Sequence, residues 1–249
     1  YYTPGAVHAP IQVPKEWRDK YKGQFDEGWH AYRAQQLKRQ KKLGLVPEDA
    51  KMVDWPEVLP QWDSFSAEGK RYLSRQMEVN AAFLEHVDHH IGRVVDHIED
   101  MGELDNTLVI YLTADNGCTA EGTPTGTFSE LLFQNGFPPL TMEQQLEKLE
   151  AFGGLDAWGG PHLANHYSVA WAYASSTPFQ WTKQMASHFG GTMSATAIRY
   201  PKAIKARGEW RRQFQNVIDL VPTILEVTGV PVPDYVNGQK RKPYPGKSL

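Results

Sequence analysis

An apolar run that ends in two polar side chains constrains the fold of this chain most strongly. The segment Asn106–Gly117 reads N-T-L-V-I-Y-L-T-A-D-N-G, and its core, Leu108–Leu112, is apolar, β-branched and aromatic. Such a run is typical of a strand buried at the centre of a parallel sheet. Ligands of open α/β sheets bind beyond the carboxyl ends of the strands, so Asp115 and Asn116 are predicted to lie at a functional site.

The Asp115–Asn116 pair offers one carboxylate and one amide carbonyl. These are hard oxygen donors, which favour Ca²⁺ or Mg²⁺ over Zn²⁺. The same Asp-Asn-Gly sequence is also a strong turn signal, because asparagine and glycine tolerate positive φ angles. The residues alone therefore leave two interpretations open, a metal site and a plain turn.

Three further segments carry motifs in a defined order along the chain. Tyr2–Pro10 ends in H-x-P and contains His8. Thr177–Lys183 reads T-P-F-Q-W-T-K and is followed at Ser187–Gly191 by S-H-F-G-G. Val217–Leu225 reads V-I-D-L-V-P-T-I-L. Together with the D-N-G segment, these motifs resemble those of the sulfatase family, in the same order and over most of the chain.

The resemblance implies an α/β fold with a mostly parallel sheet flanked by helices, like that of alkaline phosphatases and sulfatases, here incomplete. Residues 1–249 would form an internal part of a single catalytic domain. Asp115 and Asn116 would be ligands of the active-site metal, Ca²⁺ or alternatively Mg²⁺. His8 and Lys183 would be catalytic residues. The implied activity is hydrolysis of sulfate esters, either small aryl sulfates or carbohydrate sulfates.

Two parts of the family pattern are absent from residues 1–249. One is the C-x-[PA]-S-R motif, whose cysteine is oxidised to formylglycine, and the other is a pair of upstream aspartates that completes the metal site. The single cysteine, Cys118, begins C-T-A-E-G, with Gly122 in the position of the motif arginine. Cys118 is therefore not assigned as the nucleophile. We expect an internal fragment, inactive alone, whose formylglycine lies in an upstream part.

Two other functions share parts of this pattern. A phosphonate or phosphodiester hydrolase of the same superfamily would use the same metal-binding Asp-Asn pair. A non-catalytic protein could bind sulfated ligands without cleaving them. A formal net charge of −3 gives no electrostatic case for a nucleic-acid partner. No apolar stretch approaches the roughly 20 residues that span a bilayer. The residues indicate neither compartment nor oligomeric state.

Hydrophobic periodicity and capping residues predict helices over residues 24–43, 67–101, 141–152 and 219–229, and a strand over 196–200. The second helix carries His86 and His90, an i, i+4 pair that could suggest a metal site. That hypothesis is rejected, because these side chains flank the apolar stripe and do not converge with a carboxylate. The aromatic segment 153–176 could form a leaving-group pocket or simply pack, and both remain open. His188 is left without a role.

Overall fold

The computed structural model describes residues 1–249, which form two compact units, Tyr1–Ile204 and Lys205–Leu249. The prediction of a single domain is not tested by this division and stays a prediction. The first unit contains most of the regular structure: α1 (Lys15–Arg18), α2 (Gly28–Lys42), α3 (Ala67–Asp100), β1 (Val109–Leu112), α4 (Glu130–Gln134), α5 (Met142–Glu150), α6 (Val169–Ser175), α7 (Phe189–Thr192) and β2 (Thr196–Arg199).

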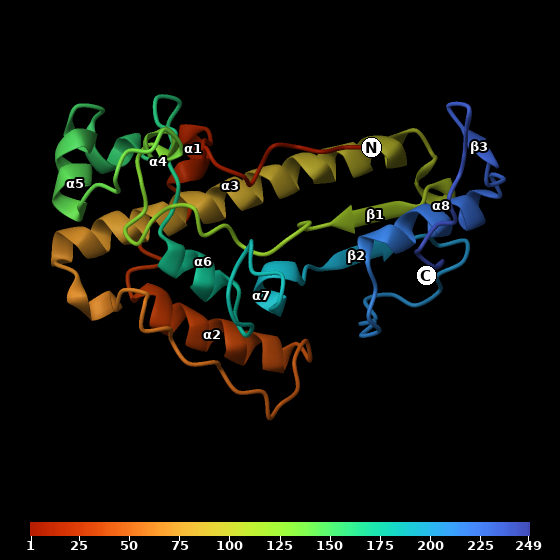
Figure 1. Ribbon diagram of the computed structural model, residues 1–249, viewed down its shortest axis with the longest axis horizontal. Coiled ribbons are helices and arrows are strands. Elements are labelled where there is room, and N and C mark those ends of the chain that lie inside the picture. The colour runs from red at the N-terminus through yellow and green to blue at the C-terminus, as the bar shows by residue number, and fades with distance from the viewer. The chain divides into compact units, whose positions relative to one another are not determined.

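The long helix α3 is the main support of the first unit. The Ser66 side chain caps its start by accepting a hydrogen bond from the Gly69 N–H at 3.1 Å. Gly102, with a φ of 73°, ends it. The predicted helix over residues 67–101 is therefore confirmed. Figure 1 shows α1 lying against α3, and α2 lying beside α6. These contacts between helices enclose the core.

Aromatic side chains fill this core. Trp29 of α2 packs edge-to-face on Trp171 of α6, with ring centroids 5.7 Å apart, and Trp158 packs on Tyr72 at 5.2 Å. All four of these rings are fully buried. Such rings contribute more buried apolar area than any other side chain. For these aromatic residues of segment 153–176, the packing interpretation is correct and the pocket interpretation is wrong.

The predicted helix over residues 141–152 is present as α5. Its Thr141 hydroxyl accepts a hydrogen bond from the Gln144 N–H at 3.3 Å, and the Gln144 side chain accepts one from the Thr141 N–H at 2.9 Å. This reciprocal pair is a capping box, which satisfies N–H groups that lack partners within the helix. Gly153, with a φ of 103°, follows the helix in the left-handed conformation.

The predicted strands are present, but their pairing differs from the expectation. β1 pairs antiparallel with β2, with Val109 opposite Arg199 and Leu112 opposite Thr196. Both sheets of the structure have two antiparallel strands, so the predicted mostly parallel sheet is not observed. β1 is half-buried, not central, because only one strand flanks it and covers its backbone. Its apolar side chains are typical of a buried strand, but they do not encode the direction of the neighbouring strand.

The segment that carries His8 is fixed by backbone hydrogen bonds to a distant part of the chain. The Ile11 N–H donates to the Asn165 carbonyl at 3.2 Å, and the Val13 N–H donates to the Gly159 carbonyl at 3.0 Å. The Ile11 side chain is fully buried. These contacts hold the residues after His8 alongside the segment that leads to His166.

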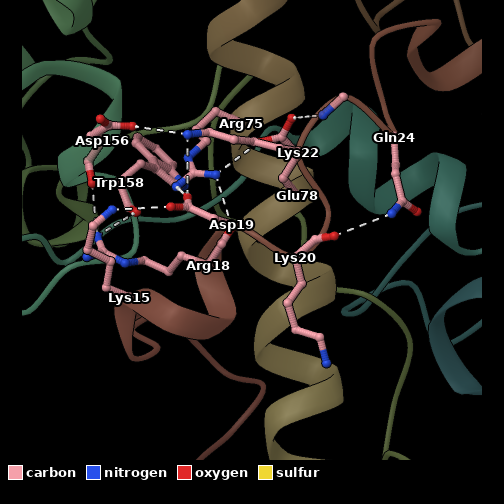
Figure 2. Close-up of polar contacts among 11 residues, drawn as sticks. Lys15, Arg18, Asp19, Lys20, Lys22, Gln24, Arg75, Glu78, Asp156 and Trp158 are labelled. Carbon is pink, nitrogen blue, oxygen red and sulfur yellow. Dashed lines mark hydrogen bonds and ion pairs between the residues drawn. The ribbon is translucent and has the colours of Figure 1, made fainter.

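A buried ion network then attaches the next turn of chain to α3 (Figure 2). Arg75 donates to the Glu78 carboxylate at 3.0 Å and to the Asp19 carboxylate at 2.8 Å. It also donates to the Arg18 carbonyl at 3.0 Å. The side chains of Arg75 and Glu78 are only 6% and 7% exposed. Buried charges are tolerated only when they are paired in this way.

The second unit contains a 3₁₀ turn (Val217–Asp219), α8 (Leu220–Thr228) and a hairpin of β3 (Tyr235–Val236) with β4 (Gln239–Lys240). The helix predicted over 219–229 is confirmed, and Gly229 ends it with a φ of 67°. Asp219 occupies the N-cap position of α8 as predicted, but its side chain makes no capping hydrogen bond to that helix. Asn216 caps the preceding turn, and the Asp219 carboxylate accepts from the Asn216 and Lys247 N–H groups. No helix in either unit combines the length and apolar character needed to cross a membrane.

Candidate active site

The two predicted catalytic residues, His8 and Lys183, lie in direct contact. Lys183 Nζ is 3.3 Å from His8 Nε2, although the residues are 175 positions apart. His8 Nδ1 lies 2.8 Å from the Ala9 carbonyl oxygen, which can only accept, so Nδ1 carries a proton. In the neutral tautomer Nε2 is then free to accept from the Lys183 ammonium. The structure therefore joins an imidazole and an ammonium that the sequence indicated separately.

Close backbone contacts at three glycines, Gly117, Gly190 and Gly191, position the loop that carries Lys183. The Lys183 N–H donates to the Cys118 carbonyl at 2.9 Å, and the Gly117 N–H donates to the Gly191 carbonyl at 3.0 Å. A Cβ on Gly117 would collide with the Gly190 carbonyl, and a Cβ on Gly190 would collide with backbone of the Lys183 loop. The S-H-F-G-G motif thus allows close approach of backbone to backbone. This approach brings Lys183 to the segment that follows the D-N-G motif.

The backbone on both sides of Lys183 is in the left-handed region. Trp181 has a φ of 65° and Gln184 a φ of 79°. This conformation is unfavourable for residues with a Cβ and persists only where surrounding contacts hold it. The loop that carries the Lys183 ammonium is therefore held in this conformation by its packing as a whole, because a single hydrogen bond would not be enough to hold it.

Glu121 is a member of the site that the sequence analysis did not single out. Its Oε2 lies 3.7 Å from Lys183 Nζ and accepts from the Thr119 hydroxyl at 3.0 Å. Its Oε1 accepts from the Gln184 side-chain amide at 2.9 Å. Burial alone would raise the pKa of Glu121, but the Thr119 hydrogen bond and the Lys183 charge outweigh it and lower that pKa below its usual value. Glu121 lies in the glycine-rich loop after the D-N-G motif, which was the available sequence signal.

Glu130 is a second carboxyl whose charge interacts with this group of residues. Its side chain is buried, and burial raises its pKa above the usual value, with the neighbouring Glu121 charge acting in the same direction. The charges of His8 and Lys183 oppose this effect without cancelling it. Glu121 and Glu130 thus have pKa values that their surroundings shift in opposite directions.

His166 connects the site to the core. It is fully buried, with Nδ1 2.9 Å from the Tyr167 carbonyl oxygen and Nε2 3.3 Å from the Thr119 hydroxyl. A Cβ on Gly122 would collide with the Tyr167 carbonyl and lie 2.5 Å from His166 Nδ1. The A-E-G sequence around Glu121 therefore needs glycine at its third position so that the loop can lie on His166.

The buried imidazole makes stability depend on pH. Burial lowers the pKa of His166 in the folded state, although the Tyr167 carbonyl opposes the shift. As the pH falls through about 6.5, the unfolded chain therefore binds the proton first, and stability is lost until the pH passes below the folded-state pKa. We expect the unfolding free energy of the wild type to fall more than that of His166→Gln between about pH 7.5 and about pH 5.5.

Urea denaturation of both proteins at both pH values measures this difference. The same substitution at the exposed His162 is the control and should leave the wild-type pH dependence in place. Equal losses in wild type and His166→Gln would contradict the expected role of burial.

Asp115 and Asn116 lie where β1 runs out into a bend, with Asp115 exposed. The Asn116 amide nitrogen donates to one carboxylate oxygen of Asp115 at 2.7 Å. The second carboxylate oxygen and the amide carbonyl make no hydrogen bond, so two hard oxygen donors are available to a divalent cation. No hydrogen bond or ion pair joins this pair to His8 or Lys183, and no three His, Cys, Asp or Glu side chains converge on a common point. The metal-ligand role of the pair stays a prediction.

Four remaining side chains, those of Cys118, His188, His86 and His90, take no part in this contact network. Burial raises the pKa of the Cys118 thiol, which disfavours the reactive thiolate. His188 bonds to the Ser187 hydroxyl at 2.9 Å and, with Phe179 and Phe189, lines a cavity of about 280 Å³. On α3, His86 and His90 face each other with their Nε2 atoms 3.0 Å apart.

Comparison with known proteins shows one family. The family model described as Sulfatase matches residues 1–230. An uncharacterized sulfatase of Schizosaccharomyces pombe is 37% identical over 233 residues, covering 92% of this chain and 39% of the relative. An arylsulfatase of Klebsiella aerogenes is 26% identical over 225 residues, covering 90% of this chain and 45% of the relative. An N-acetylglucosamine-6-O-sulfatase of Bacteroides thetaiotaomicron is 26% identical over 203 residues, covering 75% of this chain and 26% of the relative. The chain thus spans less than half the length of each relative.

Proposed function

The chain belongs to the sulfatase family, and from the contact between His8 and Lys183 we propose that the intact protein hydrolyses sulfate esters. Residues 1–249 would supply part of the metal site and part of the sulfate site. The observation that carries the proposal is the 3.3 Å contact between Lys183 Nζ and His8 Nε2. It supports a shared site because the family resemblance gives both motifs active-site roles, and the fold brings them into contact although they are far apart in sequence.

Lys183 would bind sulfate as a compact positive charge. During cleavage, negative charge spreads onto the nonbridging oxygens and onto the departing ester oxygen, so fixed cations near both lower the barrier. An ammonium on a short, well-held loop meets this need. The left-handed backbone at Trp181 and Gln184 supports this role, because it restricts where the ammonium can lie.

His8 would hold a proton for the leaving oxygen. With Nδ1 bonded to the Ala9 carbonyl, only Nε2 faces Lys183. Imidazole is suited to proton transfer near neutral pH. When a sulfate ester draws the Lys183 ammonium to its own oxygens, His8 Nε2 would be free to take up a proton from solvent and then to donate it to the ester oxygen that leaves.

Asp115 and Asn116 would hold the divalent cation, Ca²⁺ or alternatively Mg²⁺, through the carboxylate and the amide oxygen. When bound, such a cation orients the sulfate and withdraws charge from it. The formylglycine of the family, formed from a cysteine in C-x-[PA]-S-R, would come from a part of the protein outside residues 1–249, because Cys118 lies in a different sequence. The segment by itself would then be inactive.

The substrate class remains aryl or carbohydrate sulfates. One relative is named an arylsulfatase and another an N-acetylglucosamine-6-O-sulfatase. Both names denote enzymes that act on sulfate esters, which supports the proposed bond but not a particular leaving group.

The proposal is tested by assaying the intact protein with an aryl sulfate, a carbohydrate sulfate and a phosphate diester. We expect turnover of a sulfate ester, loss of that turnover when the divalent cation is chelated, and recovery when Ca²⁺ is restored. Residues 1–249 alone are the matched control and should give no turnover. Faster cleavage of the phosphate diester would instead support the phosphodiesterase alternative. Binding of sulfated ligands without turnover would support a non-catalytic role.

A further inference from the structure

We propose that Glu121 is a positioning residue, which holds the Lys183 ammonium in place and weakens the binding of free sulfate at the same time. The inference rests on the proposed function of Lys183 at a sulfate site. It assigns a role to the Glu121 carboxylate, whose negative charge opposes the binding of an anionic group such as sulfate at the neighbouring site.

The contacts of Glu121 fix both of its carboxylate oxygens. Oε1 accepts from the Gln184 side chain at 2.9 Å, and Oε2 accepts from Thr119 at 3.0 Å. Lys183 Nζ then lies 3.7 Å from Oε2. A carboxylate with separate donors on each oxygen cannot rotate to follow the lysine. The lysine must therefore adapt to the position of Glu121.

The anchoring continues into the core through Thr119. Its hydroxyl has one proton and two neighbouring acceptors, the Glu121 carboxylate at 3.0 Å and His166 Nε2 at 3.3 Å. The closer and charged acceptor receives the stronger hydrogen bond. Because Thr119 and His166 are both buried, this anchor of Glu121 belongs to the core, whereas the other anchor, Gln184, is exposed.

Lys183 is held between two partners of different character. Glu121 and His8 contact its Nζ at 3.7 and 3.3 Å, and its side chain is 23% exposed. A long, flexible lysine side chain otherwise has many rotamers, so an ordered anionic partner narrows the positions of the ammonium. Misplacement of a catalytic group by about 1 Å can cost on the order of 100-fold in rate.

The two effects of Glu121 have opposite signs, which makes them separable by experiment. Replacing Glu121 with glutamine keeps the size of the side chain and removes its charge. We expect kcat for a sulfate ester to fall by about 10- to 100-fold, because Lys183 is less well placed. We expect free sulfate to bind more tightly, by up to about 10-fold, because a nearby negative charge is gone.

The experiment measures kcat and KM for the intact protein, and the dissociation constant of inorganic sulfate by titration calorimetry. Glu85→Gln is the matched control, because Glu85 pairs with Lys20 at 2.6 Å on the surface. The control should leave all three quantities within about twofold of wild type, as expected for an exposed ion pair. Thr119→Val should lower kcat in the same direction as Glu121→Gln but by less, because it removes one of the two anchors.

Three results would overturn the inference: an unchanged kcat in Glu121→Gln, a fall of kcat together with unchanged or weaker sulfate binding, or no sulfate binding by the wild type. The second result would mean that Glu121 only maintains the fold. If the wild type cleaves no sulfate ester, the proposed function fails, and the calorimetric comparison of Glu121→Gln with wild type alone decides whether Glu121 controls the anion site.

Discussion

Replacement of Lys183 by methionine is expected to lower kcat/KM for a sulfate ester by about 100- to 1,000-fold, the loss typical when one preorganised charge-stabilising donor is removed. Methionine keeps an unbranched side chain of similar length but cannot donate a hydrogen bond or carry charge. The loop should keep its shape, because the Lys183 backbone N–H still bonds to the Cys118 carbonyl.

Lys70→Met is the control for this substitution. Lys70 forms an ion pair with Asp63 at 2.8 Å, and its side chain is 30% exposed, close to the 23% of Lys183. Both variants remove a partly exposed paired lysine, so stability effects should be similar and small. Equal activity losses in the two variants would contradict a catalytic role for Lys183.

A double-mutant cycle with His8→Gln extends this test. Since Nζ and Nε2 are 3.3 Å apart, the two side chains should act as a unit. The effects of residues that act together are not additive, so the double variant should be scarcely worse than the poorer single variant. Fully additive losses in steady-state kcat/KM would show that the contact has no functional consequence.

Replacement of Arg75 by methionine is expected to lower the free energy of unfolding by about 3–5 kcal/mol, because the Glu78 charge is then left buried without its partner. The side chains of Arg75 and Glu78 are 6% and 7% exposed, so water cannot easily replace the lost contact. The Asp19 carboxylate and the Arg18 carbonyl would lose a donor as well. Urea denaturation followed by tryptophan fluorescence measures the loss.

Arg71→Met is the matched control, since Arg71 lies one turn earlier on α3 and is exposed. It should change stability by less than about 0.5 kcal/mol. Adding Glu78→Leu to Arg75→Met should recover part of the stability, because it removes the unpaired buried charge. A small effect of Arg75→Met, similar to that of Arg71→Met, would show that the network in Figure 2 contributes little.

Local sequence signals were sufficient for the longer helices, α2, α3, α5 and α8, but not for the short helices α1, α4, α6 and α7. Apolar residues at helical spacing predicted α3, and Gly102 marked its end. Thr141 and Gln144 form the capping box of α5, which depends only on residues three positions apart. Such features are predictable because their contacts are made within one or two turns of the same helix.

The direction of strand pairing was not predictable in this way. The apolar run at β1 was taken as a central parallel strand, whereas β2 pairs with it antiparallel and it is half-buried. Side-chain character indicates how much a strand is buried, but the neighbour is chosen by distant parts of the chain.

The sequence by itself determined the family, the longer helices and the residue types available for chemistry, namely His8, Lys183 and the Asp115–Asn116 pair. Those properties follow from local periodicity and from motif order, which can be recognised without knowledge of long-range contacts. Only the tertiary structure decided that His8 meets Lys183 and that Glu121, anchored by Thr119 and the buried His166, stands beside them. The physical reason is that these contacts depend on backbone packing at Gly117, Gly190 and Gly191, between segments that are far apart in the chain.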